Sequence, residues 1–160
     1  MNIAELIHPE SVVLDLKAAN KHDALEELSR HVAGRTQFNP QTIFKTIIAY
    51  EVFCTTAIGM GVAVPHARFR AQNTLIGCFA RLARPVEFGA ADRQPVDLVF
   101  LLLGTEPADK LYVNSLVAIA KALRIPTVRD RLRGAEGAQS VREIFFTDGQ
   151  LMRLPQVLAR

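Results

Sequence analysis

The chain has 160 residues, the size of one ordinary domain and enough to bury a sizeable core. Hydrophobic residues make up 49% and charged residues 22%, a balance that excludes a disordered or fibrous protein. The formal net charge is only +3, and the 19 Lys and Arg residues are spread along the chain apart from a cluster at 124–133, which argues against a dedicated nucleic-acid-binding protein.

Cysteine usage and hydropathy indicate the compartment. Cys54 and Cys78 form neither a CxxC pair nor a disulfide framework, so both are interpreted as reduced thiols. The opening MNIAELIHPESVVLD has no basic region followed by a long apolar one, and no later window reaches the roughly 18 apolar residues of a membrane span. We expect a cytoplasmic protein without membrane insertion.

The first third of the chain predicts one strand and two helices. The β-branched run SVVLDL at 11–16 predicts a strand. Apolar residues at helical spacing predict a helix over about 20–33, with Asn20 as its cap. A second helix is predicted over about 40–53, with Asn39 as its cap.

Three apolar runs then predict three strands, at 61–64, 74–83 and 96–104, with turns over the polar segments between them. The third run is almost continuously apolar. It is therefore expected to be a central strand that is covered on both faces.

Helical spacing returns over 109–125 and is interrupted by Pro126, and two shorter helices are predicted over 127–135 and 140–146. This order predicts a single-domain α/β fold over residues 1–150, with a mixed β-sheet flanked by helices on both faces. The apolar tail 151–160 would dock on the domain, join a dimer contact or bind a partner.

Several common kinds of site lack support. In IGMGVAV, Val64 stands where a dinucleotide-binding loop has its third glycine, and no Gly-Lys-Ser/Thr of a P-loop occurs. The histidines and cysteines lack metal-ligand spacing, so no metal site is predicted and His22 and His31 are interpreted as exposed residues of a helix. No G-x-S-x-G motif favours a hydrolase. The basic cluster at 124–133 is interpreted as a solvated helix face, with a docking patch for an acidic partner as the alternative.

The stretch AIGMGVAVPHARF is the strongest candidate site. His66 follows a proline at the end of an apolar run, and a neutral imidazole can accept a phosphoryl group on a ring nitrogen. The hydroxyls of Thr55 and Thr56 and the backbone N–H groups of the glycine-containing turn could bind its oxygens. The other interpretation is a structural histidine at a strand end.

The segment YEVFCTTAIGMGVAVPHARF resembles the active-site signature of the fructose/mannitol-type enzyme IIA domains of the bacterial sugar phosphotransferase system. Further similarity extends over SVVLDLKAANKHDALEELSRHVA, PVEFGAADRQPVDLVFLLLGTEP and LVAIAKALRIPTVRDRLRGAEGAQSVREIF. The single-domain length and the segment PVEFGAADRQPVDLVFLLLG are most similar to the nitrogen-regulatory branch of this family.

The resemblance implies that His66 accepts a phosphoryl group from a phosphocarrier protein of the HPr or NPr type, without a cofactor or metal. It implies docking of that carrier on an apolar surface around the histidine, with Met60, Val64, Phe69 and Arg68 as candidate contacts. It also implies regulated partners, such as potassium transport or sensor-kinase components. A homodimer is a further possibility that the sequence leaves open.

The chain departs from the family pattern at the residues expected to support the phosphoryl group. Tyr50-Glu51 stands where the family has Arg-Glu, and Lys110 is assigned to the position of a second histidine. In the turn, Ala57 stands where the family commonly has glycine, and Ala67 replaces the glycine that follows the active histidine. Arg68 or Arg70 would supply a compensating charge, or would be a solvated arginine.

These departures keep two functions open. The first is a phosphocarrier and regulatory protein, in which Tyr50, Glu51, Thr55, Thr56 and Lys110 support the phosphoryl group on His66. The second is a IIA-like binding module that retains the fold but transfers phosphate weakly or not at all.

Overall fold

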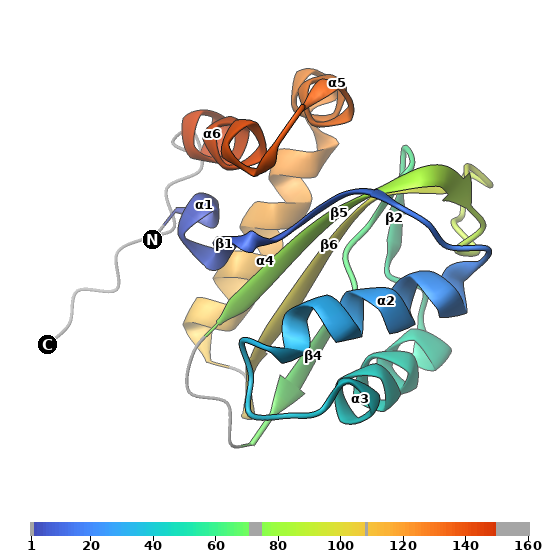
Figure 1. The fold of residues 1–160 in the computed structure, drawn as a ribbon, viewed down its shortest axis with the longest axis vertical. Helices are drawn as coiled ribbons and strands as arrows, with labels where there is room; N and C mark the ends of the chain where they lie inside the picture. Colours follow the sequence, from blue (N-terminus) through green and yellow to red (C-terminus); the bar gives the residue numbers. More distant parts are fainter. Residues whose placement is uncertain (1, 71–74, 108, 150–160) are drawn as a thin grey trace, which may run out of the picture.

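A mixed β-sheet lies between two layers of helices in the computed structural model, which describes residues 2–70, 75–107 and 109–149 (Figure 1). This arrangement confirms the predicted fold class. The predicted tail at 151–160 lies outside the described residues.

Six strands form the sheet in this part of the chain, in the order β1-β5-β6-β3-β2, with β4 also paired to β6. Their bounds are β1 Ile7–Leu16, β2 Ala57–Gly59, β3 Val62–Ala63, β4 His66–Phe69, β5 Ile76–Val86 and β6 Val96–Thr105. β1 and β5 are parallel, β5 and β6 are antiparallel, and β3 and β4 both run parallel to β6. β3 and β4 thus occupy successive parts of the same side of β6.

Strand β6 is the centre of the core, as its continuous apolar sequence predicts. Alternate side chains point to opposite faces of a strand, and both sets are buried here. Leu98, Phe100 and Leu102 belong to the core on one face of the sheet, and Val99, Leu101 and Leu103 to the core on the other.

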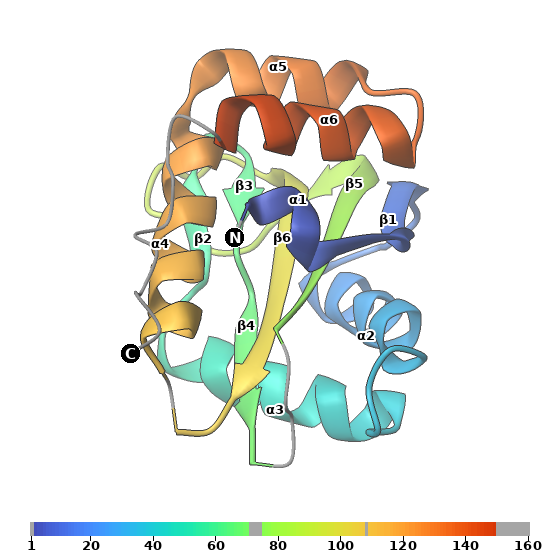
Figure 2. The same ribbon diagram turned by 90° about the vertical axis from the view of Figure 1, so that its left-hand side faces the viewer.

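The helices divide between the two faces (Figure 2). α2 (Lys21–Ala33) and α3 (Pro40–Phe53) cover one face, and α1 (Ile3–Leu6), α4 (Lys110–Arg124), α5 (Pro126–Gly134) and α6 (Ala138–Gly149) cover the other. The predicted caps are confirmed, because the Oδ1 atoms of Asn20 and Asn39 accept hydrogen bonds from the backbone N–H groups of Asp23 (2.9 Å) and Thr42 (2.8 Å).

Two parts of the chain differ from the elements that the sequence predicts. β1 begins at residue 7 instead of 11 and follows the unpredicted helix α1. The segment after Pro65, predicted as a turn, is instead the strand β4, because its backbone pairs with β6. His66–Phe69 does alternate between half-buried and buried residues, but four residues between a proline and a polar segment are too few for that alternation to be distinguished from a turn.

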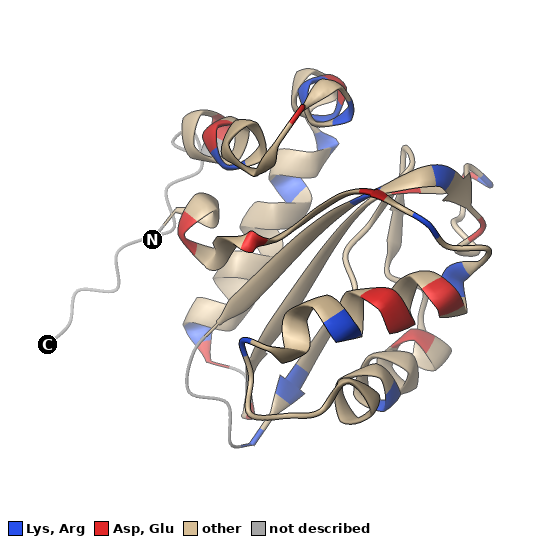
Figure 3. Ribbon diagram, in the orientation of Figure 1, with Lys and Arg blue, Asp and Glu red and all other residues tan. Residues whose placement is uncertain are grey.

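The arginines of the basic cluster at 124–133 lie at the surface, as the interpretation of a solvated helix face predicts, and they also make contacts within the protein. Nη1 of Arg129 donates to the carbonyl of Arg124 at the end of α4 (2.7 Å), and Arg131 pairs with Asp148 (2.8 Å). Arg133 pairs with Asp97 (2.8 Å). These arginines join α5 to its neighbours, and basic and acidic residues are interspersed over the ribbon (Figure 3).

Within the described residues, no single helix is long and apolar enough to cross a membrane. α4 and α5 satisfy that test only together, and the chain bends by 83° between them.

Gly61 connects β2 and β3 in a conformation that only glycine adopts easily. Its φ is +78°, and a Cβ there would lie 2.7 Å from Nη2 of Arg133 and 2.8 Å from Oδ1 of Asp97. We expect Gly61→Ala to lower the free energy of unfolding by about 2 kcal/mol, measured by urea denaturation. In the control Gly134→Ala, the new Cβ would meet nothing within 4 Å. An equal effect of the two substitutions would contradict this explanation.

Candidate functional site

His66 is the first residue of β4, and the break between β3 and β4 orients its ring. The carbonyl of Pro65 accepts a hydrogen bond from the N–H of Leu102 (3.0 Å), so the chain remains attached to β6 across the break. The carbonyl of Val64 instead lies 2.9 Å from Nδ1 of His66. A carbonyl only accepts, so Nδ1 carries the proton and the lone pair of the neutral ring is on Nε2.

His66 lines an open groove of about 490 Å³ between the end of α3, the residues before β2, and α4. Its walls combine hydroxyl, thiol and apolar groups. The lining residues are Tyr50, Phe53, Cys54, Thr55, Thr56, Ile58, Val64, His66, Leu116 and Ala120. The structure thus brings His66 together with four of the predicted site residues, Tyr50, Thr55, Thr56 and Val64.

Glu51 organises one wall of the groove from inside the protein. Its side chain is 3% exposed and pairs with Nζ of Lys21 (3.2 Å). It also accepts hydrogen bonds from the N–H of Thr56 (3.1 Å) and from the Thr56 hydroxyl (2.6 Å). The Thr55 hydroxyl donates to the carbonyl of Phe88 (2.8 Å). Both threonine hydroxyls therefore already have acceptors in the protein, and Glu51 acts on the wall rather than on the groove itself.

Tyr50 connects His66 to an arginine and a second tyrosine. The ring centroids of Tyr50 and His66 are 6.0 Å apart, and the Tyr50 hydroxyl accepts a hydrogen bond from Nε of Arg68 (3.2 Å). The guanidinium carbon of Arg68 lies 5.9 Å from the centroids of both the Tyr50 and Tyr112 rings. The hydrogen bond to Tyr50 raises the pKa of Arg68 above its usual value, so Arg68 is a permanent cation beside His66.

Three predicted residues lie elsewhere. Lys110 is exposed at the start of α4 and is not among the residues that line the groove; Tyr112, two residues later, is the α4 side chain next to Arg68. Phe69 is 7% exposed and stacks on Phe38, so it is a core residue and not a docking contact. Met60 lies in the β2–β3 turn, where its N–H donates to Asp92 (2.7 Å).

Sequence reasoning missed Phe53, Ile58, Leu116, Ala120 and Tyr112. Leu116 and Ala120 are four residues apart and so lie on one side of α4. The sequence shows that spacing, but it does not show that this side of the helix faces His66. Phe53 is 92% exposed at the end of α3, where the helical pattern gives no sign of an exposed aromatic residue.

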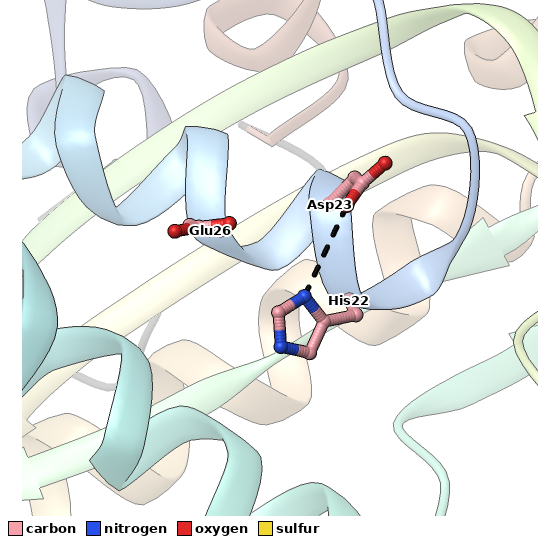
Figure 4. Close-up of side chains that lie close together, drawn as sticks. All are labelled: His22, Asp23 and Glu26. Carbon is pink, nitrogen blue, oxygen red and sulfur yellow. Dashed lines mark ion pairs between the residues drawn. The ribbon is translucent and has the colours of Figure 1, made fainter.

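His22, Asp23 and Glu26 on α2 also lie close together (Figure 4). Nδ1 of His22 is 3.9 Å from Asp23, and Glu26 pairs with Arg30 (3.2 Å). The ring of His22 also packs edge-on against Phe44. Because each of the three has a partner within the protein, their proximity does not by itself indicate a metal site.

The groove thus contains an imidazole whose Nε2 can act as a nucleophile, next to a permanent cation and a partly apolar rim. Such a site can form a covalent bond to an electrophile that carries negative charge.

The chain belongs to the EIIA 2 family of the phosphoenolpyruvate-dependent sugar phosphotransferase system, whose model matches residues 5–147. This confirms the family that the sequence resembles.

The relatives indicate the nitrogen-regulatory branch. A nitrogen regulatory protein of Bradyrhizobium diazoefficiens is 40% identical over 141 residues, covering 88% of this chain and 92% of that protein. That of Escherichia coli K12 is 32% identical and covers 90% of this chain and 89% of the relative. The crystal structure of the nitrogen regulatory protein IIA-Ntr from Neisseria meningitidis superimposes with a TM-score of 0.86 at 30% identity, covering 89% of this chain and 98% of that one.

Removing Glu51 is expected to destabilise the fold, because it would leave Thr56 N–H without its acceptor and Lys21 without its counter-charge. We expect Glu51→Ala to lower the free energy of unfolding by about 3 kcal/mol in urea denaturation. The exposed Glu87 provides a control, since Glu87→Ala should change it by less than about 0.5 kcal/mol. Similar values for both variants would contradict the structural role of Glu51.

The two cysteines should differ in reactivity. Cys54 is exposed at the groove, whereas complete burial raises the pKa of Cys78 to about 12, so Cys78 has almost no thiolate at pH 8. We expect iodoacetamide to modify one thiol of the folded protein and both after denaturation, measured by mass spectrometry. Cys54→Ser should then leave the folded protein unmodified; labelling of Cys78 in that variant would contradict its burial.

Proposed function

We propose that this protein is a phosphocarrier and regulatory protein of the nitrogen branch of the phosphotransferase system, phosphorylated on Nε2 of His66. The observation that carries the proposal is the hydrogen bond between Nδ1 of His66 and the carbonyl of Val64. His66 lines an open groove, and the chain belongs to the EIIA 2 family. That contact holds the ring in the tautomer whose lone pair is on Nε2.

In the transfer step, Nε2 of His66 attacks the phosphorus atom of a phosphohistidine on the carrier. The new N–P bond forms as the carrier's N–P bond breaks, and the carrier's imidazole leaves with that electron pair. Nδ1 keeps its proton throughout, so the phosphorylated ring carries a positive charge at Nδ1–H. The carbonyl of Val64 stabilises that charge by accepting the hydrogen bond, now a charge-assisted one.

The donor in this proposal is a carrier of the HPr or NPr type that docks over the groove. Phe53, Ile58 and Leu116 form an apolar rim, and Phe53 is almost fully exposed. An exposed aromatic residue next to a reactive groove is typical of a protein-binding surface. Of the earlier candidates, Arg68 remains in this contact surface, whereas Met60, Phe69 and the buried Val64 do not.

Regulation follows from the change in charge. Phosphorylation of His66 adds a nearly dianionic group to a partly apolar surface, so partners that bind one form are excluded by the other. The proposal places the protein in the cytoplasm, with targets of the kind that the nitrogen-regulatory resemblance implies, such as potassium transport or sensor-kinase components.

A second candidate function is a IIA-like binding module with weak or no phosphotransfer. The specific observation in its favour is Tyr50, a neutral side chain in contact with the His66 ring where the family resemblance leads us to expect arginine. Such a module would bind its partners through the same groove without being switched by phosphorylation.

Phosphorylation with phosphoenolpyruvate, enzyme I and a cognate carrier separates the two functions. We expect one acid-labile, base-stable phosphoryl group per chain, absent from His66→Ala and retained in His22→Ala, which removes an exposed histidine of α2. ¹H–¹⁵N correlation spectra of the labelled ring should place phosphorus on Nε2. If the wild type takes up no label at any carrier concentration, the binding module is the correct function.

A further inference from the structure

We propose that Arg68 and Tyr112 are the residues that bind the phosphoryl group on His66, with Tyr50 as the residue that positions Arg68. This inference rests on the proposed function and assigns the phosphate-binding part of its site. It assigns the positive charge of the site to Arg68 on β4, two residues after His66, and not to position 50 or 110.

Strand geometry puts Arg68 on the same side of β4 as His66. Residues two apart in a strand point to one face, about 6.6 Å from each other along the chain. Arg68 is directly opposite Gly104 of β6, just as His66 is opposite Leu102. The guanidinium can therefore extend alongside the imidazole on which the phosphoryl group would form.

Tyr50 and Tyr112 hold the guanidinium from two elements. Tyr50, on α3, accepts the hydrogen bond from Nε (3.2 Å), and its ring centroid lies 5.9 Å from the guanidinium carbon. The ring centroid of Tyr112, on α4, lies at the same distance from that carbon. The hydrogen bond uses Nε and not the two terminal nitrogens, which are the atoms with which an arginine binds two phosphate oxygens.

The tyrosine on α4 adds a second, independent observation. Tyr112 is 4% exposed, and among the described residues its hydroxyl has no hydrogen-bond partner. A buried hydroxyl without a partner costs folding free energy, and such groups occur where a ligand supplies the partner. Burial raises the pKa of Tyr112 to about 12, so its hydroxyl remains a donor at neutral pH.

Gly104 is the residue that makes room for this arrangement. A Cβ at position 104 would overlap the ring of Tyr112, so the absence of a side chain allows that ring to lie against β6 next to Arg68. Tyr50, at a position that departs from the family pattern, and Tyr112, two residues after the position assigned to the second histidine, thus combine with Arg68 into one phosphate-binding cluster. The cluster would replace the arginine and histidine that the resemblance leads us to expect.

The test compares phosphoryl transfer from the carrier to wild type, Arg68→Ala, Tyr112→Phe and Tyr50→Phe. We expect Arg68→Ala to slow transfer by at least ~30-fold, and each tyrosine variant by about 5-fold. Arg70→Ala removes the same charge from an arginine whose side chain is 90% exposed, and should change the rate by less than about 2-fold. Equal effects of Arg68→Ala and Arg70→Ala would overturn the assignment of Arg68.

A titration of the phosphohistidine by ³¹P NMR reports contact with the phosphoryl group itself. A cation and a donor beside the dianion lower the second pKa of the phosphoryl group, so that pKa should rise in Arg68→Ala and Tyr112→Phe. A purely structural role of either residue would leave it at the wild-type value, which would overturn the proposal for that residue.

Folding of Tyr112→Phe is measured in parallel with Ser115→Ala. Ser115 is another residue of α4 with a buried hydroxyl that has no partner in the described part of the chain. Both variants should unfold at wild-type or higher urea concentrations, and only Tyr112→Phe should slow transfer. If Ser115→Ala slows transfer equally, the effect belongs to α4 packing and the role of Tyr112 is overturned. These outcomes all require a wild type that is labelled on His66; an unlabelled wild type refutes the proposed function instead.

Discussion

The interruption of the edge strand at Val64 and Pro65 is the constraint on which the site depends. Pro65 has no N–H, so the β-ladder cannot continue through it in the ordinary way. The N–H of Val64 donates to the carbonyl of Thr56 (2.9 Å), while the carbonyl of Pro65 holds the chain to β6. The carbonyl of Val64 is thereby left to face the ring of His66, and this one contact favours the neutral tautomer whose lone pair is on Nε2.

The two helical layers then complete the groove from opposite faces of the sheet. α3 belongs to one layer and contributes Tyr50 and Phe53; α4 belongs to the other and contributes Leu116 and Ala120. Beside His66 the sheet edge is open, because β4 pairs with β6 and with no other strand of the described residues. Buried Glu51 fixes the end of α3 to the segment before β2, so the wall of the groove is held by the core and not by surface contacts.

The sequence was sufficient for the fold because its signals were local and strong. The apolar run of β6 and the caps Asn20 and Asn39 each have one physical interpretation, and the structure agrees with all three. The candidate His66 was likewise identified from a motif of adjacent residues. The contacts around His66 could not be identified in this way, because Arg68 is on β4 and Tyr112 is on α4. The two residues meet only through the strand register that pairs residue 68 with residue 104. A single sequence carries no direct record of that register.

The geometry of α4 explains why Lys110 does not lie at the candidate site. A helix residue two positions along points about 200° further round the axis, so Lys110 and Tyr112 cannot both face the sheet. Tyr112 packs against β6 and Lys110 is exposed. A charge at the site therefore has to come from another element, and Arg68 lies on the side of β4 that His66 occupies. In the proposed function, the cation near His66 comes from β4 and not from position 50, because the hydroxyl of Tyr50 accepts a hydrogen bond from Arg68.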